Sequence, residues 1–374
     1  MRTIKLAVIG GGSSYVPELL DGVIRKWEAG EFHAKDIVLV DVPEGRERME
    51  TVAGFSRRMM SKRGMPCHLE TSLDRRDALD GADFVISQIR VGGMTARRSD
   101  EHISLRHGAI GQETTGPGGF ANALRTIPVS LEIAKDIKDV SPGAWLLNFT
   151  NPSGLVTEAL LRHSDVKTFG LCNVPIGIKM GVARALNVDP SRVSIDVSGL
   201  NHLSFVTGIC LDGQDVSRRI FESPLFPLYL ESERFGSGFA RHLRYLRVIP
   251  ASYLYYYWFT ERALKAEQKD VADGKGTRAD EVLRIEKELF EMYASDISGV
   301  LPPALKKRGG AYYSDVALSC ISAMVRDQPA LEVLNVSNRG SVPGLDPEAT
   351  VEVSCLVDAR GPHPLAQKRL PTEV

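Results

Sequence analysis

The sequence predicts an α/β fold, in which a doubly wound parallel sheet is followed by a second α+β lobe. Three observations lead to this prediction. Short apolar runs alternate with helical patterns, a glycine-rich turn joins the first run to the first helix, and the chain has 374 residues. A chain of that length can bury a large core and is expected to divide into two lobes. We expect residues 1–172 to form the first lobe and residues 173–374 the second.

Composition narrows the class of protein. The net charge of −1 gives no general field for nucleic acid or an anionic membrane, so neither is expected as a partner. The five cysteines are scattered without paired spacing, which is typical of a reducing compartment. No signal-peptide pattern and no apolar run of membrane-spanning length is present. We therefore expect a cytoplasmic enzyme.

The N-terminal region has the pattern of a dinucleotide-binding loop. Ile4–Ile9 reads as a strand, Val16–Trp27 as a helix, and Gly10-Gly-Gly-Ser-Ser-Tyr15 as the turn between them. Glycines let the backbone approach a pyrophosphate, and the helix N-terminus offers free N–H groups. Tyr15 stands where a third glycine is usual, which weakens the motif taken alone. The candidate cofactor-binding residues of this loop are Gly10, Gly12, Ser13 and Ser14.

A second strand, Asp36–Asp41, supports this interpretation. It ends in Asp41, which is placed to accept the ribose hydroxyls and would repel the extra phosphate of NADP. The sequence therefore favours NAD as cofactor. An ordinary α/β turn with a surface aspartate would give the same pattern and stays open as an alternative.

The following segments continue the alternation. Arg46–Arg63 reads as a helix and Ala82–Gln88 as a strand, whose carboxyl end faces the ligand side of a parallel sheet. Arg97 and Arg98 come soon afterwards. Two adjacent arginines are usually a solvated face, but beyond such a strand end they could also clamp a phosphate.

Polar segments follow two more predicted elements. Ile110–Phe120 is rich in glycine and polar residues, and we expect it to be a functional loop between two helices. Trp145–Thr150 reads as a strand that is broken by Asn151-Pro152. A turn of this kind would hold the Asn151 carboxamide at a fixed angle in the cleft.

Cys172 and His202 are the candidate metal ligands. Cys172, followed by Asn173, ends the apolar run Val166–Leu171, and His202 follows a further strand-like run. A thiolate and an imidazole at two strand tips can share a divalent metal, and neighbouring carboxamides can hold a sugar hydroxyl. One buried free thiol and one core histidine would explain the same two residues, and spacing this wide does not decide between the readings.

The remainder of the chain forms the predicted second lobe. Phe235–Phe239 is a glycine-containing interruption that could serve as a lid or a subunit contact. Long helices are expected over Ala263–Tyr293, with a break at Ala272–Gly276 that delivers Arg278. A further helix is expected through Ala323 and a strand at Val351–Val357. No internal repeat is present.

Several of these motifs, in order, resemble glycoside hydrolase family 4, the NAD- and manganese-dependent glycosidases, and most closely its 6-phospho-β-glucosidases. The resemblance covers nearly the whole chain. Its motifs are Gly10-Gly-Gly-Ser-Ser-Tyr15, Gly111-Gln-Glu-Thr-Thr-Gly-Pro-Gly-Gly119, Thr150-Asn-Pro152, Cys172-Asn-Val-Pro-Ile-Gly177, Gly199-Leu-Asn-His-Leu-Ser204, Tyr253-Leu-Tyr-Tyr-Tyr257, Thr277-Arg-Ala-Asp-Glu-Val282 and Asn335-Val-Ser-Asn-Arg-Gly340.

The resemblance implies a role for each matching residue. Cys172 and His202 would bind Mn²⁺ or another divalent metal. Tyr253 would be the catalytic base, and Glu113 would raise its basicity. The residues that match positions at the phosphorylated sugar are Arg97, Asn151, Asn173 and Arg278. Because residue 173 is Asn and not Asp, the acid of the α-glycosidase branch is missing, and the acid that protonates the leaving group stays unassigned.

The reaction implied by the resemblance is a hydrolysis with internal oxidation and reduction, an exception to the usual two-carboxylate scheme. A hydride leaves sugar C3 for NAD⁺, a base removes the C2 proton, and the C1 substituent is eliminated. Water then adds and NADH returns the hydride. A phenol with an ordinary pKa near ~10 needs a nearby cation to act as that base. Tyr253 is the candidate, although Tyr255, Tyr256 and Tyr257 belong to the same aromatic run.

Two other functions remain compatible with the residues. One is an NAD-dependent oxidoreductase of the lactate/malate dehydrogenase fold type, which would share the nucleotide half. The other is a non-catalytic sensor of NAD or phospho-sugar. For the enzyme implied by the resemblance, the substrate would be a phosphorylated disaccharide or β-glucoside, and the assembly a homodimer or homotetramer. Family members usually continue past Leu370 with further helices that help pack the second lobe, and this sequence stops at Val374.

Overall fold

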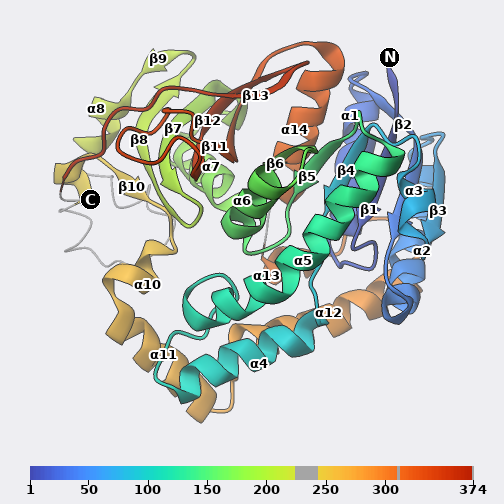
Figure 1. Ribbon diagram of the computed structural model, residues 1–374, viewed down its shortest axis with the longest axis horizontal. Helices are drawn as coiled ribbons and strands as arrows, with labels where there is room; N and C mark the ends of the chain where they lie inside the picture. The colour runs from blue at the N-terminus through green and yellow to red at the C-terminus, as the bar shows by residue number, and fades with distance from the viewer. Residues whose placement is uncertain (224–242, 310–311, 373–374) are drawn as a thin grey trace.

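A computed structural model describes residues 1–223, 243–309 and 312–372 (Figure 1). Within these residues, one sheet has the strand order β13-β12-β11-β6-β5-β4-β1-β2-β3. Its parallel part contains β1 (Thr3–Ile9), β2 (His33–Val40), β3 (His68–Ser72), β4 (Phe84–Ser87), β5 (Trp145–Asn148) and β6 (Lys167–Gly170). The order 3-2-1-4-5-6 is that of a Rossmann-type sheet, and the predicted fold class is confirmed.

Three C-terminal strands extend this sheet in the antiparallel sense. They are β11 (Ala330–Ser337), β12 (Thr350–Asp358) and β13 (Gly361–Pro364). The junction with the parallel part is the pairing of Asn335 in β11 with Gly170 in β6. The sheet therefore takes strands from both sides of residue 172.

The helices cover the sheet and build a separate helical layer. In the first half they are α1 (Val16–Glu28), α2 (Arg46–Lys62), α3 (Arg75–Leu79), α4 (Gly93–Arg106), α5 (Gly116–Val140), α6 (Ser153–His163) and α7 (Asn173–Leu186), with the 3₁₀ turns η1 (Pro43–Gly45) and η2 (Pro190–Arg192). In the second half they are α8 (Ser217–Phe221), α10 (Leu254–Trp258), α11 (Thr260–Ala272), α12 (Arg278–Ser295), α13 (Leu305–Arg308) and α14 (Tyr313–Arg326). Helices α5, α11 and α12 all contact α4, below the sheet in Figure 1.

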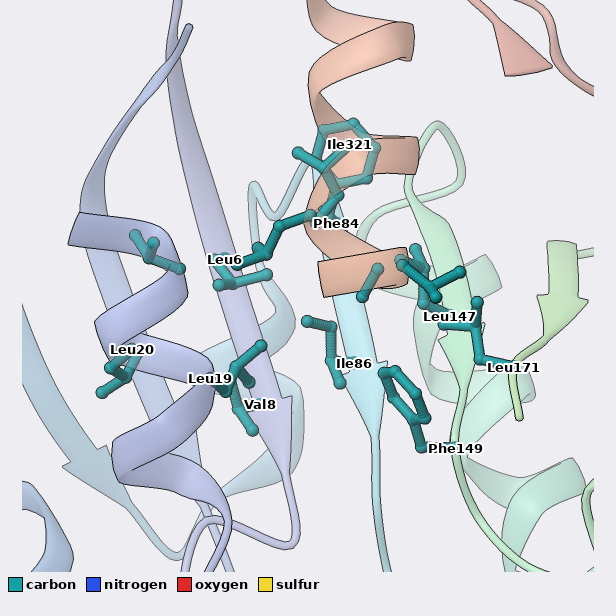
Figure 2. Close-up of a cluster of buried hydrophobic side chains, with 14 of the residues drawn as sticks. Leu6, Val8, Leu19, Leu20, Phe84, Ile86, Leu147, Phe149, Leu171 and Ile321 are labelled. Carbon is teal, nitrogen blue, oxygen red and sulfur yellow. The ribbon is translucent and has the colours of Figure 1, made fainter. Parts of the chain in front are cut away.

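The core of the parallel sheet includes a helix from the C-terminal half. Figure 2 shows Ile321 of α14 packed among side chains of the sheet, with Leu19 and Leu20 of α1 on the same face. All three side chains are fully buried, and burial of each contributes roughly 1.5–3 kcal/mol relative to exposure. The two halves of the sequence therefore share one core.

A smaller antiparallel sheet stands beside the large one. It consists of β7 (Val193–Leu200), β8 (Leu203–Leu211), β9 (Gln214–Asp215) and β10 (Ile249–Pro250). Ser354 of β12 joins the two sheets, because its Oγ donates to the Ile195 carbonyl and accepts from the Val197 amide, each at 2.9 Å. The turn between β7 and β8 carries His202, and its other residue, Asn201, accepts the Gly154 N–H of α6 at 3.3 Å.

The expected loop over residues 110–120 is shorter than predicted, because α5 already begins at Gly116. Pro117 fits the first turn, where its missing N–H costs nothing. The next two positions require glycine. A Cβ on Gly118 would lie 2.3 Å from the Gln112 carbonyl oxygen, and a Cβ on Gly119 would lie 2.5 Å from the Thr114 carbonyl carbon. The possible lid at Phe235–Phe239 lies outside the described residues. No helix in the described part of the chain has the length and apolar character that a membrane span needs.

Candidate active site

The glycine loop lies across the carboxyl ends of β2 and β4. The amides of Gly10 and Gly11 both donate to the Val40 carbonyl, at 2.9 and 2.8 Å. Gly10 has a φ of 89°, and a Cβ there would lie 2.7 Å from the Gln88 carbonyl oxygen. Glycine is therefore required at the first position of the loop, both by conformation and by space.

Asp41 follows β2 and contacts this loop directly. Its Oδ2 accepts the Gly12 N–H at 2.6 Å, and its Oδ1 accepts the Val42 N–H at 2.8 Å. The structure thus brings the predicted residues Gly10, Gly12, Ser13, Ser14 and Asp41 together at the ligand side of the sheet. Ser14 differs from the others, because its side chain is fully buried and its hydroxyl donates to Glu286 of α12 at 3.1 Å.

Cys172 and His202 occupy special backbone positions. Cys172 is the N-cap of α7, and its Sγ accepts the Val174 N–H at 3.5 Å. His202 lies in the β7–β8 turn with a φ of 63°. Their exposed fractions are 8% and 6%. Burial lowers the pKa of His202 to about 4, so the imidazole is neutral at pH 7, which is the form that binds metals.

Tyr253 packs directly against His202. The two rings are stacked, with 3.7 Å between centroids and 5° between planes. The pKa of the Tyr253 phenol is raised well above its usual value, first by burial and then by the charges of Glu113 and Cys172. These interactions place the predicted base beside the predicted metal ligand His202 and near the charge of Glu113.

Glu113 is held between two arginines. It forms an ion pair with Arg97 Nη1 at 2.9 Å and a second one with Arg90. Burial opposes ionisation of the Glu113 carboxyl, but the two guanidinium groups outweigh it and lower its pKa to about 2. Glu113 therefore carries a full negative charge next to the phenol at every ordinary pH.

Arg97 is a buried residue with two acidic partners. Its side chain is 6% exposed, and its Nε donates to Glu101 Oε1 at 2.8 Å. Glu101 Oε2 accepts the Ala279 N–H at 2.8 Å, in the first turn of α12. Arg97 thus links Glu113 to α12 through Glu101. If Arg97 also contacted a phosphate, it would do so while paired with Glu101 and Glu113.

Asn151, Asn173 and Arg278, which are also expected at the sugar, differ in their contacts with the residues around Glu113. The Asn151 carbonyl accepts the Asn122 amide at 3.3 Å, and the same amide donates to the Glu113 carbonyl at 3.1 Å. Asn173 is partly exposed and follows Cys172 at the start of α7. Arg278 begins α12, where it donates to the Arg308 carbonyl at 2.9 Å. In the described residues no hydrogen bond or ion pair joins Arg278 to Glu113.

Sequence reasoning missed several polar residues at this site. Glu352 of β12 is fully buried and accepts hydrogen bonds from Ser204 at 2.7 Å, Asn201 at 2.9 Å and Asn335 at 3.4 Å. The Cys172 side chain also hydrogen-bonds to Glu352, whose pKa is raised by burial. One signal was available, since a glutamate within the strand-like run Val351–Val357 suggests a buried polar role. Glu101, Arg90 and Asn122 gave no such signal.

The chemistry of two donors at the site fits a divalent metal, which Cys172 and His202 would hold. Among the residues that the structure describes, no group of three or more histidine, cysteine or acidic side chains is placed to hold an ion. A thiolate and a neutral imidazole suit a first-row transition metal.

Comparisons with known proteins agree with the fold and with the family that the motifs resemble. Residues 5–188 match the model of the family 4 glycosyl hydrolases, and residues 197–374 match the model of their C-terminal domain. A Bacillus subtilis (strain 168) protein described as "Probable 6-phospho-beta-glucosidase" is 47% identical, over 100% of this chain and 85% of that one. The 6-phospho-beta glucosidase of Thermotoga maritima, solved with manganese, NAD+ and glucose-6-phosphate, has a TM-score of 0.88 and 35% identity, over 99% of this chain and 85% of that one.

A more distant likeness concerns the fold alone. Cryptosporidium parvum malate dehydrogenase has a TM-score of 0.56 and 15% identity, over 100% of this chain and 93% of that one. The fold is therefore similar to that of the dehydrogenases, while the family models match residues 5–188 and 197–374. The chain belongs to the family 4 glycosyl hydrolases.

Proposed function

We propose that this enzyme hydrolyses 6-phospho-β-glucosides with the help of bound NAD and a divalent cation such as Mn²⁺. The observation that carries the proposal is the contact of Tyr253 with His202 beside Cys172 and the ionised Glu113. The names of the relatives support the substrate, and the ligands of the Thermotoga maritima structure support the cofactors.

The chain's own residues would divide the chemistry between them. Bound NAD and a metal held by Cys172 and His202 would supply a hydride acceptor at sugar C3 and polarisation of the sugar oxygens. Tyr253 would then remove the C2 proton, and elimination at C1 would follow. The charge of the bound metal would favour the phenolate form of Tyr253, and Glu113 would make that phenolate a stronger base, since its negative charge raises the pKa of the phenol.

The phosphate would be held by cations at the edge of this site. Arg278 is partly exposed at the start of α12. It lies close enough to Tyr15, at the end of the glycine loop, for its charge to affect the phenol: burial raises the pKa of Tyr15, and the positive charges of Arg308 and Arg278 partly oppose this. We propose that Arg278 contacts the 6-phosphate, with Arg97, Asn151 and Asn173 orienting the sugar. A charge-assisted contact of this kind contributes about 1.5–3 kcal/mol.

We further propose that the two parts of the chain have different roles and that the protein is a homo-oligomer. Residues 1–172 would bind NAD, and residues 173–374 would supply the metal ligands, the base and the contacts of a homodimer or homotetramer. Light scattering of the purified protein tests the assembly directly.

The decisive experiment is hydrolysis of p-nitrophenyl 6-phospho-β-glucoside with and without added NAD⁺ and Mn²⁺. We expect cleavage only when both are present, with no net formation of NADH. Net NADH formation would instead indicate an oxidoreductase. Tight binding of NAD or phospho-sugar without turnover, in reducing buffer with Mn²⁺, would indicate a sensor.

A further inference from the structure

Helix α12 contacts the glycine loop through two buried side chains, Glu286 and Tyr293. The Ser14 hydroxyl donates to Glu286 Oε1 at 3.1 Å, and the Tyr293 hydroxyl donates to the Ser14 carbonyl at 2.9 Å. The two helical residues are seven positions apart and share one face of α12. The side chain and the carbonyl of Ser14 are thus both held by the second half of the chain.

The Glu286 carboxylate also forms ion pairs with two arginines. Arg48 of α2 donates to Glu286 Oε2 at 2.9 Å, and Arg308 of α13 donates to Oε1 at 3.0 Å. Arg48 in addition lies 3.4 Å from the carbonyl oxygen of Gly12, to which its Nε donates. Glu286 is 5% exposed, and a buried carboxylate with such partners stays ionised, in agreement with its lowered pKa.

This network differs from a direct role of Ser14 at the cofactor. Because the Ser14 hydroxyl donates its one proton to Glu286, that proton is not available to a pyrophosphate in this arrangement. The glycine-rich segment before Ser14 is intrinsically flexible, and ordering it on binding would cost free energy. An anchor that orders the loop beforehand removes that cost.

We propose that Glu286 is a positioning residue that holds the glycine loop in its nucleotide-binding conformation, acting through Ser14. The inference rests on the proposed binding of NAD. It adds that the affinity for NAD is set by a helix of the C-terminal half, whose first residue is the candidate phosphate ligand Arg278.

The test is isothermal titration of NAD⁺ into the full-length protein and its variants. Glu286→Ala and Ser14→Ala are each expected to weaken binding about tenfold, and the double variant no more than Glu286→Ala alone, because both single changes remove the hydrogen bond between Ser14 and Glu286. Glu288→Ala is the matched control, since it removes the same side chain from an exposed position of the same helix. In turnover assays the KM for NAD⁺ should rise, while kcat at saturating NAD⁺ stays near that of the parent.

The outcomes separate this inference from the proposed function. A parent that binds no NAD⁺ overturns both. A parent that binds NAD⁺, with a Glu286→Ala variant that binds equally well, overturns the inference alone. Additive effects of Ser14→Ala and Glu286→Ala also overturn it, because Ser14 would then contact the nucleotide itself. If Glu286→Ala does not fold, Ser14→Ala and Tyr293→Phe still test the anchor, and parental affinity in both contradicts it.

Discussion

The imidazole of His202 lies flat on the phenol ring of Tyr253, with ring centroids 3.7 Å apart. The residue proposed to hold the metal and the residue proposed to remove the C2 proton therefore fix each other's position. The φ of 63° at His202 comes from a tight turn between β7 and β8, so this contact depends on the hairpin of the second sheet. Four predictions follow from the site and its surroundings.

The first prediction concerns Cys172. Cys172→Ser should abolish Mn²⁺ binding and Mn²⁺-dependent turnover, because a serine hydroxyl is a far weaker metal ligand than a thiolate. The fold should survive, since serine is a good N-cap and can accept the Val174 N–H in place of the thiol. NAD⁺ binding should also survive, because the glycine loop is built from other residues. Calorimetric titration of Mn²⁺ and of NAD⁺ measures the two properties separately.

Cys210→Ser is the control, since Cys210 lies on β8 and is partly exposed. Parental affinity for Mn²⁺ in Cys172→Ser would contradict the metal assignment. A linked expectation is that peroxide inactivates the enzyme and added thiol restores it, since only the thiolate binds the metal.

The second prediction separates the two arginines proposed at the sugar. Arg97→Ala should lower the free energy of unfolding by about 3–5 kcal/mol, because it leaves Glu101 and Glu113 as buried charges without one of their partners. Arg278→Ala should change stability little, since its side chain is 34% exposed, and should raise the KM for a 6-phosphorylated substrate by at least about tenfold. Urea unfolding and steady-state kinetics measure these effects.

Arg284→Ala provides a control for Arg278→Ala, because Arg284 is an exposed arginine on the same helix. The phosphate assignment is wrong if Arg278→Ala discriminates between phosphorylated and free sugars as the parent does. Arg97→Ala should raise the same KM, and its loss of stability distinguishes it from Arg278→Ala.

The third prediction concerns stability and pH. Glu18 of α1 accepts the Ser314 hydroxyl at 2.7 Å, and burial raises the pKa of its carboxyl from 4.5 to about 7. Between these two values the folded protein keeps a proton that the unfolded chain releases. Stability therefore falls as the pH rises through this window, and the penalty is complete above it. Glu18→Gln removes the titration and keeps an oxygen for Ser314.

Glu18→Gln should consequently be more stable than the parent at about pH 8, by on the order of 1–3 kcal/mol, and nearly equal to it at about pH 4.5. Urea unfolding at the two pH values measures the difference. Glu288→Gln, at an exposed position, should show no such change. A difference between Glu18→Gln and the parent that does not vary with pH would contradict the prediction.

The parallel sheet could be predicted because its signals are local. Ile4–Ile9, the glycine turn and Val16–Trp27 read as strand, turn and helix, and the structure has β1 and α1 within one residue of these bounds. The start of α5 could not be predicted in this way. Glycines at residues 116, 118 and 119 indicate a loop by propensity. In the structure, close packing against residues 112–114 requires glycine at 118 and 119, and a φ of 66° favours glycine at 116.

The contacts that hold the site together were beyond sequence reasoning for a different reason. Glu286 lies in an amphipathic helix, where a glutamate is ordinary, and its burial depends on how α12 docks onto α2 and the glycine loop. Arg97 looked like half of an exposed arginine pair, and only the packing of α4 against α12 shows that it is buried while Arg98 is exposed. Local pattern gives the elements, whereas partners distant in sequence decide which charges are enclosed.

The last prediction tests the order of bond breaking at the sugar. If Tyr253 removes the C2 proton after oxidation at C3, product formed in D₂O must carry deuterium at C2, which nuclear magnetic resonance of the released 6-phospho-sugar detects. Substrate deuterated at C2 or C3 should react more slowly wherever those steps limit the rate. A glycosidase that uses two carboxylates would show neither effect, because it breaks no ring C–H bond.

Tyr253→Phe keeps the aromatic ring against His202 and removes only the hydroxyl, so the protein should fold and bind NAD⁺ while deuterium incorporation and hydrolysis are lost together. Tyr257→Phe is the matched control, because Tyr257 is in the same tyrosine run and is 48% exposed. It should retain both activities. Loss of activity in Tyr257→Phe with retention in Tyr253→Phe would move the base to Tyr257. Product from the parent without deuterium at C2 would exclude the elimination mechanism, whichever tyrosine were involved.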